Sequence, residues 1–206
     1  MIAGREALRR LRAGNDRFVA NVRSMEPISN AARRAELTAA QEPFAIVLGC
    51  SDSRVPVEII FDQGLGDLFV IRVAGNIVAP SLIGSVEFAA SRFGTRLVVV
   101  LGHSQCGAIV ATLDELRRPT ANQSPNLKSI VDRIRPAVED LLDGGHRDDQ
   151  AGLVSRAVRS NILASVQQLR HGSAIIESLI ADHGLTVVGA SYSLETGVVE
   201  FLEEAL

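Results

Sequence analysis

Four short apolar segments stand out along the chain, each rich in valine, isoleucine or leucine and without clean alternation of apolar and polar positions. Strands with this pattern are usually buried on both faces, as in a parallel sheet between helices. We therefore predict four strands, at Phe44–Leu48, Leu68–Val73, Leu97–Leu101 and Leu185–Ser191.

Segments with helical spacing of apolar residues separate these strands. The chain up to about Arg23 carries such a stripe, and a short helix is expected near Ala31–Ala40. Further helices are predicted at Ser81–Arg92, Cys106–Arg117, Ser129–Leu142 and in two stretches within Ala151–His183. The alternation of strands and helices indicates βαβ units with right-handed crossovers.

The last segment, Val198–Leu202, follows a tight turn at Glu195–Gly197 and predicts an antiparallel edge strand. The expected fold class is therefore α/β, with a mainly parallel four-stranded sheet, flanking helices and that edge strand. No repeat, low-complexity tract or linker interrupts the 206 residues. We expect residues 1–206 to form a single domain.

The composition limits the classes of function that fit this chain. The net charge is −3 and charged residues make up 22% of the chain, so no basic excess points to nucleic acid or a membrane surface. No apolar run approaches the roughly 20 residues of a membrane span, and the first residues lack an apolar signal core. Two cysteines are too few for a disulfide framework and suit a reducing compartment. These features predict a cytoplasmic protein.

Both cysteines lie where an apolar strand gives way to a turn. Cys50 ends the strand of FAIVLGCSDSR, while His103 and Cys106 follow the strand of LVVVLGHSQCG. Because ligands collect at the carboxyl ends of strands in an open α/β sheet, the two turns are expected at one edge. Two thiolates and one imidazole are a three-ligand zinc set that leaves the fourth tetrahedral position open for water. Taken singly, each of these residues also suits an ordinary buried position; the combination favours Zn²⁺.

Asp52 and Arg54 follow Cys50 closely. An aspartate at this spacing can accept a hydrogen bond from metal-bound water, while the arginine holds it in a bidentate pair. If that pair is broken, Asp52 becomes a possible fourth metal ligand and the site closes. The alternative is an ion pair that only caps the turn.

The segments CSDSR and HSQC, joined by EIIFDQGLGDLFVIRVAGN, resemble the β-class carbonic anhydrases. The likeness is densest from Gln41 to Leu113. It implies a lyase that hydrates carbon dioxide reversibly to bicarbonate and a proton, with a zinc-activated water as the nucleophile. It also implies a homodimer or a dimer of dimers with active sites at the interface, and an N-terminal helical arm, about residues 1–40, that packs on a partner subunit.

Residue by residue, the resemblance implies Cys50, His103 and Cys106 as zinc ligands and Asp52 and Arg54 as the catalytic pair. It implies a substrate-binding pocket made by Gln41, Phe69, Ala74, Phe88 and Gly107. Phe88 replaces a tyrosine of many plant-type members, and Ala74 replaces a bulkier apolar residue. Gln41 stands where members with a regulatory bicarbonate site have an aromatic residue, which favours an accessible zinc.

Two other functions fit the same residues. A zinc-activated water in an apolar pocket also suits hydrolysis of carbon disulfide or carbonyl sulfide, and relatives of this fold carry out that reaction. A non-catalytic, bicarbonate-sensing zinc protein would instead hold the metal with four protein ligands at every pH.

Overall fold

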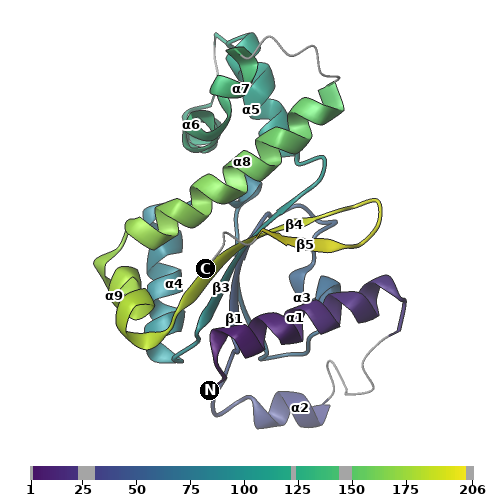
Figure 1. Cartoon of the computed structure of the whole chain (residues 1–206), viewed down its shortest axis with the longest axis vertical. Coiled ribbons are helices and arrows are strands. Elements are labelled where there is room, and N and C mark those ends of the chain that lie inside the picture. Colours follow the sequence, from purple (N-terminus) through teal and green to yellow (C-terminus); the bar gives the residue numbers. More distant parts are fainter. Residues whose placement is uncertain (1, 23–30, 122–123, 144–149, 203–206) are drawn as a thin grey trace.

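The computed structural model describes residues 2–22, 31–121, 124–143 and 150–202 (Figure 1). Its centre is a five-stranded sheet in the order β2-β1-β3-β4-β5. All neighbours in this order are parallel except β4 and β5, which pair antiparallel. The strands are β1 (Ala45–Gly49), β2 (Leu68–Arg72), β3 (Leu97–His103), β4 (Thr186–Tyr192) and β5 (Val199–Leu202). The predicted fold class is confirmed.

Strand β3 runs two residues further than its apolar run predicts. Gly102 and His103 remain paired with Ser191 and Tyr192 of β4, so the ladder continues beyond the last apolar residue. Apolar content marks where a strand is buried, whereas hydrogen bonding to its neighbour marks where it ends. The extension matters because it makes His103 the last residue of a strand in the middle of the sheet.

Both faces of the sheet are covered, which explains the continuous apolar runs. In β1, Ile46 and Leu48 belong to one buried cluster, and Ala45 and Val47 belong to the other. Helix α1 (Gly4–Val19) covers the second face, while α4 (Pro80–Arg92), α8 (Gln150–His171) and α9 (Ala174–His183) lie across the sheet from it (Figure 1).

The remaining helices are α2 (Ala31–Glu36), α3 (Val57–Ile60), α5 (Gly107–Arg117), α6 (Pro125–Val138) and α7 (Asp140–Asp143). The stretch expected as one helix at Ser129–Leu142 is thus two helices, and the first begins earlier, at the helix-starting Pro125. Helix α3 and the 3-10 turn η1 (Ala74–Asn76) were not expected. Arg23, the expected end of the first helix, lies outside the described residues.

None of the helices in the described ranges is both long and apolar enough to cross a membrane.

Helix α1 is fixed to the rest of its own chain by close packing. Ala7 and Leu11 are fully buried, and the Asn15 amide donates to the carbonyls of Ile60 (3.2 Å) and Gly197 (2.9 Å). One turn of α1 approaches the end of α3 so closely that a β-carbon on Gly14 would overlap the carbonyl oxygen of Phe61. Glycine is therefore required at that position for steric reasons. Helix α2, by contrast, has no buried residue.

We predict that Gly14→Ala destabilises the protein by about 1–3 kcal/mol, since α1 must shift away from the Phe61 carbonyl. Gly84→Ala in α4 is the matched control, because a β-carbon there meets nothing within 4 Å. It should instead stabilise by about 0.5–1 kcal/mol, as alanine normally does in a helix. Equilibrium denaturation of both variants measures the difference, and equal effects would contradict the packing of α1.

Candidate metal centre

The parallel pairing of β1 with β3 brings the cluster together. Gly49 pairs with Leu101, so Cys50 leaves β1 level with the end of β3, where His103 lies. Cys106 follows as the N-cap residue of α5, after a turn in which Gln105 has a left-handed backbone (φ 54°). Residues more than 50 positions apart thereby meet at the carboxyl edge of the sheet.

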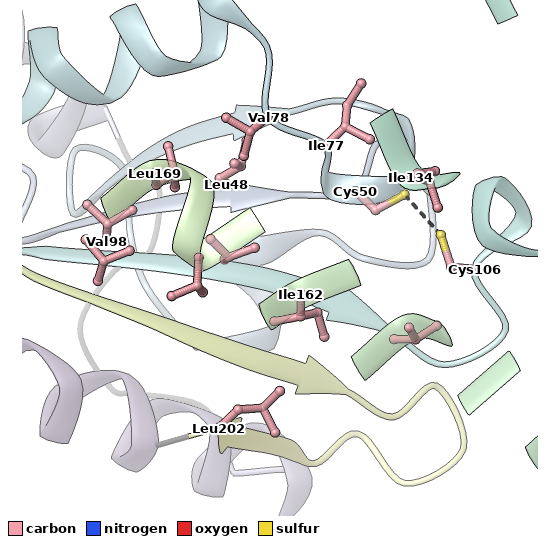
Figure 2. Packing of buried hydrophobic residues seen from close by; sticks show 14 of the residues in the cluster. Leu48, Cys50, Ile77, Val78, Val98, Cys106, Ile134, Ile162, Leu169 and Leu202 are labelled. Carbon is pink, nitrogen blue, oxygen red and sulfur yellow. Dashed lines mark hydrogen bonds between the residues drawn. The ribbon is translucent and has the colours of Figure 1, made fainter. Parts of the chain in front are cut away.

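The three side chains form one compact group. The sulfur atoms of Cys50 and Cys106 are 4.0 Å apart and face each other in Figure 2. Together with a ring nitrogen of His103, the ligand atoms all lie within 4.8 Å of one another. All three residues are buried, with 4%, 1% and 0% of Cys50, Cys106 and His103 exposed. This is the arrangement expected of a metal centre.

His103 presents only one nitrogen to the cluster. Its Nδ1 lies 2.9 Å from the carbonyl oxygen of Ser104, and since a carbonyl only accepts hydrogen bonds, Nδ1 carries the proton. Its Nε2 is buried and has no hydrogen-bond partner among the described residues. A buried ring nitrogen without a hydrogen-bond partner is costly unless it binds something, and a metal ion is a partner for which it is suited.

The pKa values of the two thiols are shifted in opposite directions. The Cys106 thiol beside it, with smaller contributions from His103 and the Gly75 N–H, lowers the pKa of Cys50. The same contact with Cys50, together with burial, raises the pKa of Cys106. Because coordination deprotonates a thiol outright, both sulfurs would serve as thiolates in a metal complex.

Asp52 lies beside the cluster, at a partly exposed position, and forms an ion pair with Arg54. The guanidinium of Arg54 donates to both carboxylate oxygens, Nε to Oδ1 at 2.9 Å and a terminal nitrogen to Oδ2 at 2.7 Å. This pairing holds the pKa of Asp52 well below its usual range, so the carboxylate is ionised. Its Oδ2 is 3.9 Å from Nε2 of His103, close to the cluster but beyond hydrogen-bond length.

A residue that sequence reasoning missed fixes the backbone of this loop. Arg72, at the end of β2, donates to the carbonyl of Cys50 (2.9 Å) and to the carbonyl of Asp52 (2.6 Å). Only its place at a strand end, beside VAGN, could have drawn attention to it in the sequence.

Glu195 was also missed as a site residue. Its carboxylate accepts from Ser104 (2.8 Å), Gln105 (2.6 Å) and Ser193 (3.0 Å). The hydrogen bond from Ser104 is the largest of the causes that lower the pKa of Glu195 to about 2. The β4–β5 turn thereby holds both residues that separate His103 from Cys106.

The expected pocket residues are only partly brought together. The rings of Phe69 and Phe88 lie 6.3 Å apart and share a cluster with Phe93, which was not expected. Phe88 is 54% exposed. Ala74 begins η1 and Gly107 begins α5, each beside a ligand segment. Gln41 is exposed in the segment before β1, and no hydrogen bond of the described chain joins it to the cluster.

Fold and site together define a class of protein: an α/β protein with a buried Cys/His/Cys cluster, suited to a metal ion, at the carboxyl edge of a mainly parallel sheet, and with an Asp–Arg pair beside it.

Comparison with known proteins gives the family. The family model described as carbonic anhydrase matches residues 45–199. The carbonic anhydrase of Mycolicibacterium smegmatis is 41% identical over 196 residues, which cover 94% of this chain and 91% of that protein. The chain belongs to the carbonic anhydrase family.

Solved structures place it in the β class. The β-carbonic anhydrase CafA of Aspergillus fumigatus superposes with a TM-score of 0.75 at 26% identity, covering 84% of this chain and 81% of that one. One of two tetrameric β-carbonic anhydrases from Sordaria macrospora gives 0.72 at 27% identity, covering 84% and 87%. The resemblance read from the sequence, and with it the expectation of a β-class lyase, is confirmed.

We predict that His103→Ala and Cys106→Ala each abolish stoichiometric metal binding, because two remaining ligands hold a metal poorly. His171→Ala, which removes an exposed imidazole from the end of α8, is the control and should retain the metal. Metal content per chain, measured by elemental analysis after dialysis, decides the question. Retention of the full metal content by Cys106→Ala would refute the ligand assignment.

Proposed function

We propose that the cluster of Cys50, His103 and Cys106 binds Zn²⁺. Two thiolates and an imidazole suit this borderline-soft ion. Two sulfurs bound to one tetrahedral zinc lie about 3.8 Å apart when each bond is about 2.3 Å, and the 4.0 Å between these sulfurs fits that spacing. The unpaired Nε2 of His103 supplies the third ligand. These residues leave the fourth tetrahedral position open.

We further propose that the protein catalyses the reversible hydration of carbon dioxide, in which CO₂ and water give bicarbonate and a proton. The observation that carries this proposal is the ionised Asp52, held by Arg54 beside an open three-ligand site. When bound there, zinc makes a coordinated water acidic enough to serve as the nucleophile.

The chain's own residues then have distinct tasks. Asp52 accepts a hydrogen bond from the nucleophilic water and orients it, and Arg54 keeps the carboxylate turned toward that role. The side chain of Gln41 and the backbone N–H of Gly107 stabilise negative charge on the substrate oxygens. The apolar side chains of Phe69, Ala74 and Phe88 line the approach for the gas.

We propose that residues 1–206 act as one catalytic domain within a homodimer or a dimer of dimers. The tetrameric β-carbonic anhydrases of Sordaria macrospora support such an assembly. The half-exposed Phe88 supports an interface near the site, and α2, with no buried residue, supports packing of the N-terminal arm on a partner. The presence of only two cysteines, both free, supports a cytoplasmic location.

We expect the purified zinc-loaded protein to hydrate carbon dioxide, and its rate to rise toward alkaline pH. Two thiolate ligands offset the charge of the metal, so the bound water is a weaker acid than at an all-histidine site, where its pKa is about 7. Stopped-flow hydration assays from pH 6 to 9 measure this, with carbon disulfide and carbonyl sulfide as competing substrates. A pH profile that is flat would refute the argument from ligand charge.

The same experiments distinguish the two alternative functions. Turnover of carbon disulfide or carbonyl sulfide without hydration of carbon dioxide would favour the hydrolase. Four protein ligands at every pH, seen by zinc-edge absorption, would favour a bicarbonate sensor.

We predict that Arg54→Ala lowers kcat/KM for carbon dioxide by about tenfold or more, because Asp52 loses the partner that orients it. Arg17→Ala is the matched control. It breaks another Arg–Asp pair, with Asp62 at 2.6 Å, between α1 and the residues after α3, and should leave the rate unchanged. Equal losses in the two variants would remove Arg54 from the mechanism.

A further inference from the structure

Two polar side chains lie in the apolar core beneath the metal cluster. Asn161 and Ser165 are on α8, one helical turn apart and so on the same face, and only 2% and 4% of their surfaces are exposed. Between them Ile162 packs so tightly on β3 that a β-carbon on Gly102, next to the ligand His103, would meet it at 2.6 Å. Burying an amide and a hydroxyl is costly unless both are hydrogen-bonded.

Both side chains bond to the same turn. The amide of Asn161 donates to the carbonyl of Gly75 at 2.9 Å, and the hydroxyl of Ser165 donates to the carbonyl of Asn76 at 3.2 Å. These carbonyls belong to η1, more than 80 residues away in the sequence. Two side chains of α8 therefore donate hydrogen bonds to the carbonyl oxygens of two successive residues of η1.

The turn η1 needs such support. Gly75 and Asn76 both have left-handed backbones, with φ of 72° and 43°, and a non-glycine residue in that region persists only where its surroundings hold it. The turn is also closely packed, since a β-carbon on Gly75 would come within 2.9 Å of Ile134 and 3.0 Å of Ala108. Packing fixes the position of the turn, and the two hydrogen bonds from α8 fix the orientation of its peptide groups.

The same turn contacts a metal ligand. The backbone N–H of Gly75 points at the sulfur of Cys50, with 3.4 Å between nitrogen and sulfur. Such a bond stabilises a thiolate and orients it toward a metal. The Gly75 N–H belongs to the peptide between Ala74 and Gly75, and Asn161 and Ser165 bond the next two peptide groups of the turn. Both side chains thus connect to Cys50 through the backbone of η1, without touching the site.

We propose that Asn161 and Ser165 are positioning residues that hold η1 so that the Gly75 N–H bonds the Cys50 sulfur, and that they thereby set the metal affinity of the site. This inference rests on the metal site of the proposed function. It concerns the residues that present the ligand and does not depend on which substrate is turned over.

The test uses Asn161→Ala and Ser165→Ala, each with a matched control. Asn15→Ala removes another buried amide that donates to main-chain carbonyls, on α1 and away from the cluster. Ser160→Ala removes another α8 hydroxyl bonded to a carbonyl, that of Ala137. Zinc affinity is measured by competition with a chromogenic chelator, the thiolate-to-cobalt absorption band is recorded after loading with Co²⁺, and thermal unfolding of each variant is followed in parallel.

We expect Asn161→Ala to weaken zinc binding by about tenfold or more and to shift the cobalt band, and Ser165→Ala to do the same to a smaller extent. The two controls should lower only the unfolding temperature. Unchanged affinity and spectrum in Asn161→Ala, or an equal loss in Asn15→Ala, would overturn the proposal. If Asn161→Ala does not fold, Ser165→Ala against Ser160→Ala decides by the same criteria.

These outcomes are separable from the proposed function. A wild type that binds zinc and cobalt through thiolates but does not hydrate carbon dioxide would refute the activity and leave the role of Asn161 to be decided by affinity. A wild type that is active, with Asn161→Ala unchanged in affinity and spectrum, would refute the role of Asn161 and leave the activity standing.

Discussion

Parallel pairing of β1 with β3 is the constraint on which the metal centre depends. Ile46–Gly49 pair in register with Val98–Leu101, so the residues that follow both strands leave the sheet at one edge. A slip of one residue would move Cys50 by about 3.3 Å and turn its side chain to the opposite face. Since the ligand atoms lie within 4.8 Å of one another, such a slip would break up the cluster. The apolar residues on both faces of β1 and β3 therefore help to position the candidate metal ligands, although they lie outside the site.

The arrangement of the cluster costs free energy that a bound metal ion would recover. The unpaired, buried Nε2 of His103 costs about 1–3 kcal/mol. Contacts independent of any metal offset part of this and hold the ligands: Ser104 fixes the ring of His103, and Gly75 bonds Cys50. A metal ion that satisfies all three ligands therefore stabilises the fold as it binds, which links metal affinity to folding.

The apolar runs were enough to predict the strands, and the Cys and His residues at strand ends were enough to predict the cluster, because both are local patterns read on a known sheet geometry. The turn η1 could not be predicted in this way. Its left-handed Asn76 is held in part by α8, which is far away in the sequence. The roles of Glu195 and Arg72 could not be predicted for the same reason, because each contacts a loop that only the folded sheet brings near it. The sequence thus reveals which residues form the cluster, and tertiary contacts decide which other residues hold them in place.

The Asp52–Arg54 pair connects this architecture to the state of the site. Arg72 fixes the backbone carbonyls on both sides of Ser51, so the loop itself is held. The backbone N–H of Arg54 also donates to Oδ1 of Asp52 at 2.9 Å. If the hydrogen bond from the Arg54 guanidinium to Oδ2 breaks, Oδ2 is therefore the oxygen that can rotate. Turning Oδ2 onto a metal would then need only side-chain rotation and the loss of an ion pair. Since the Arg54 side chain is 50% exposed, water readily replaces Asp52 as its partner. Closing a metal site with Asp52 would therefore require the loss of one half-exposed ion pair, which salt weakens, and no rearrangement of the fold.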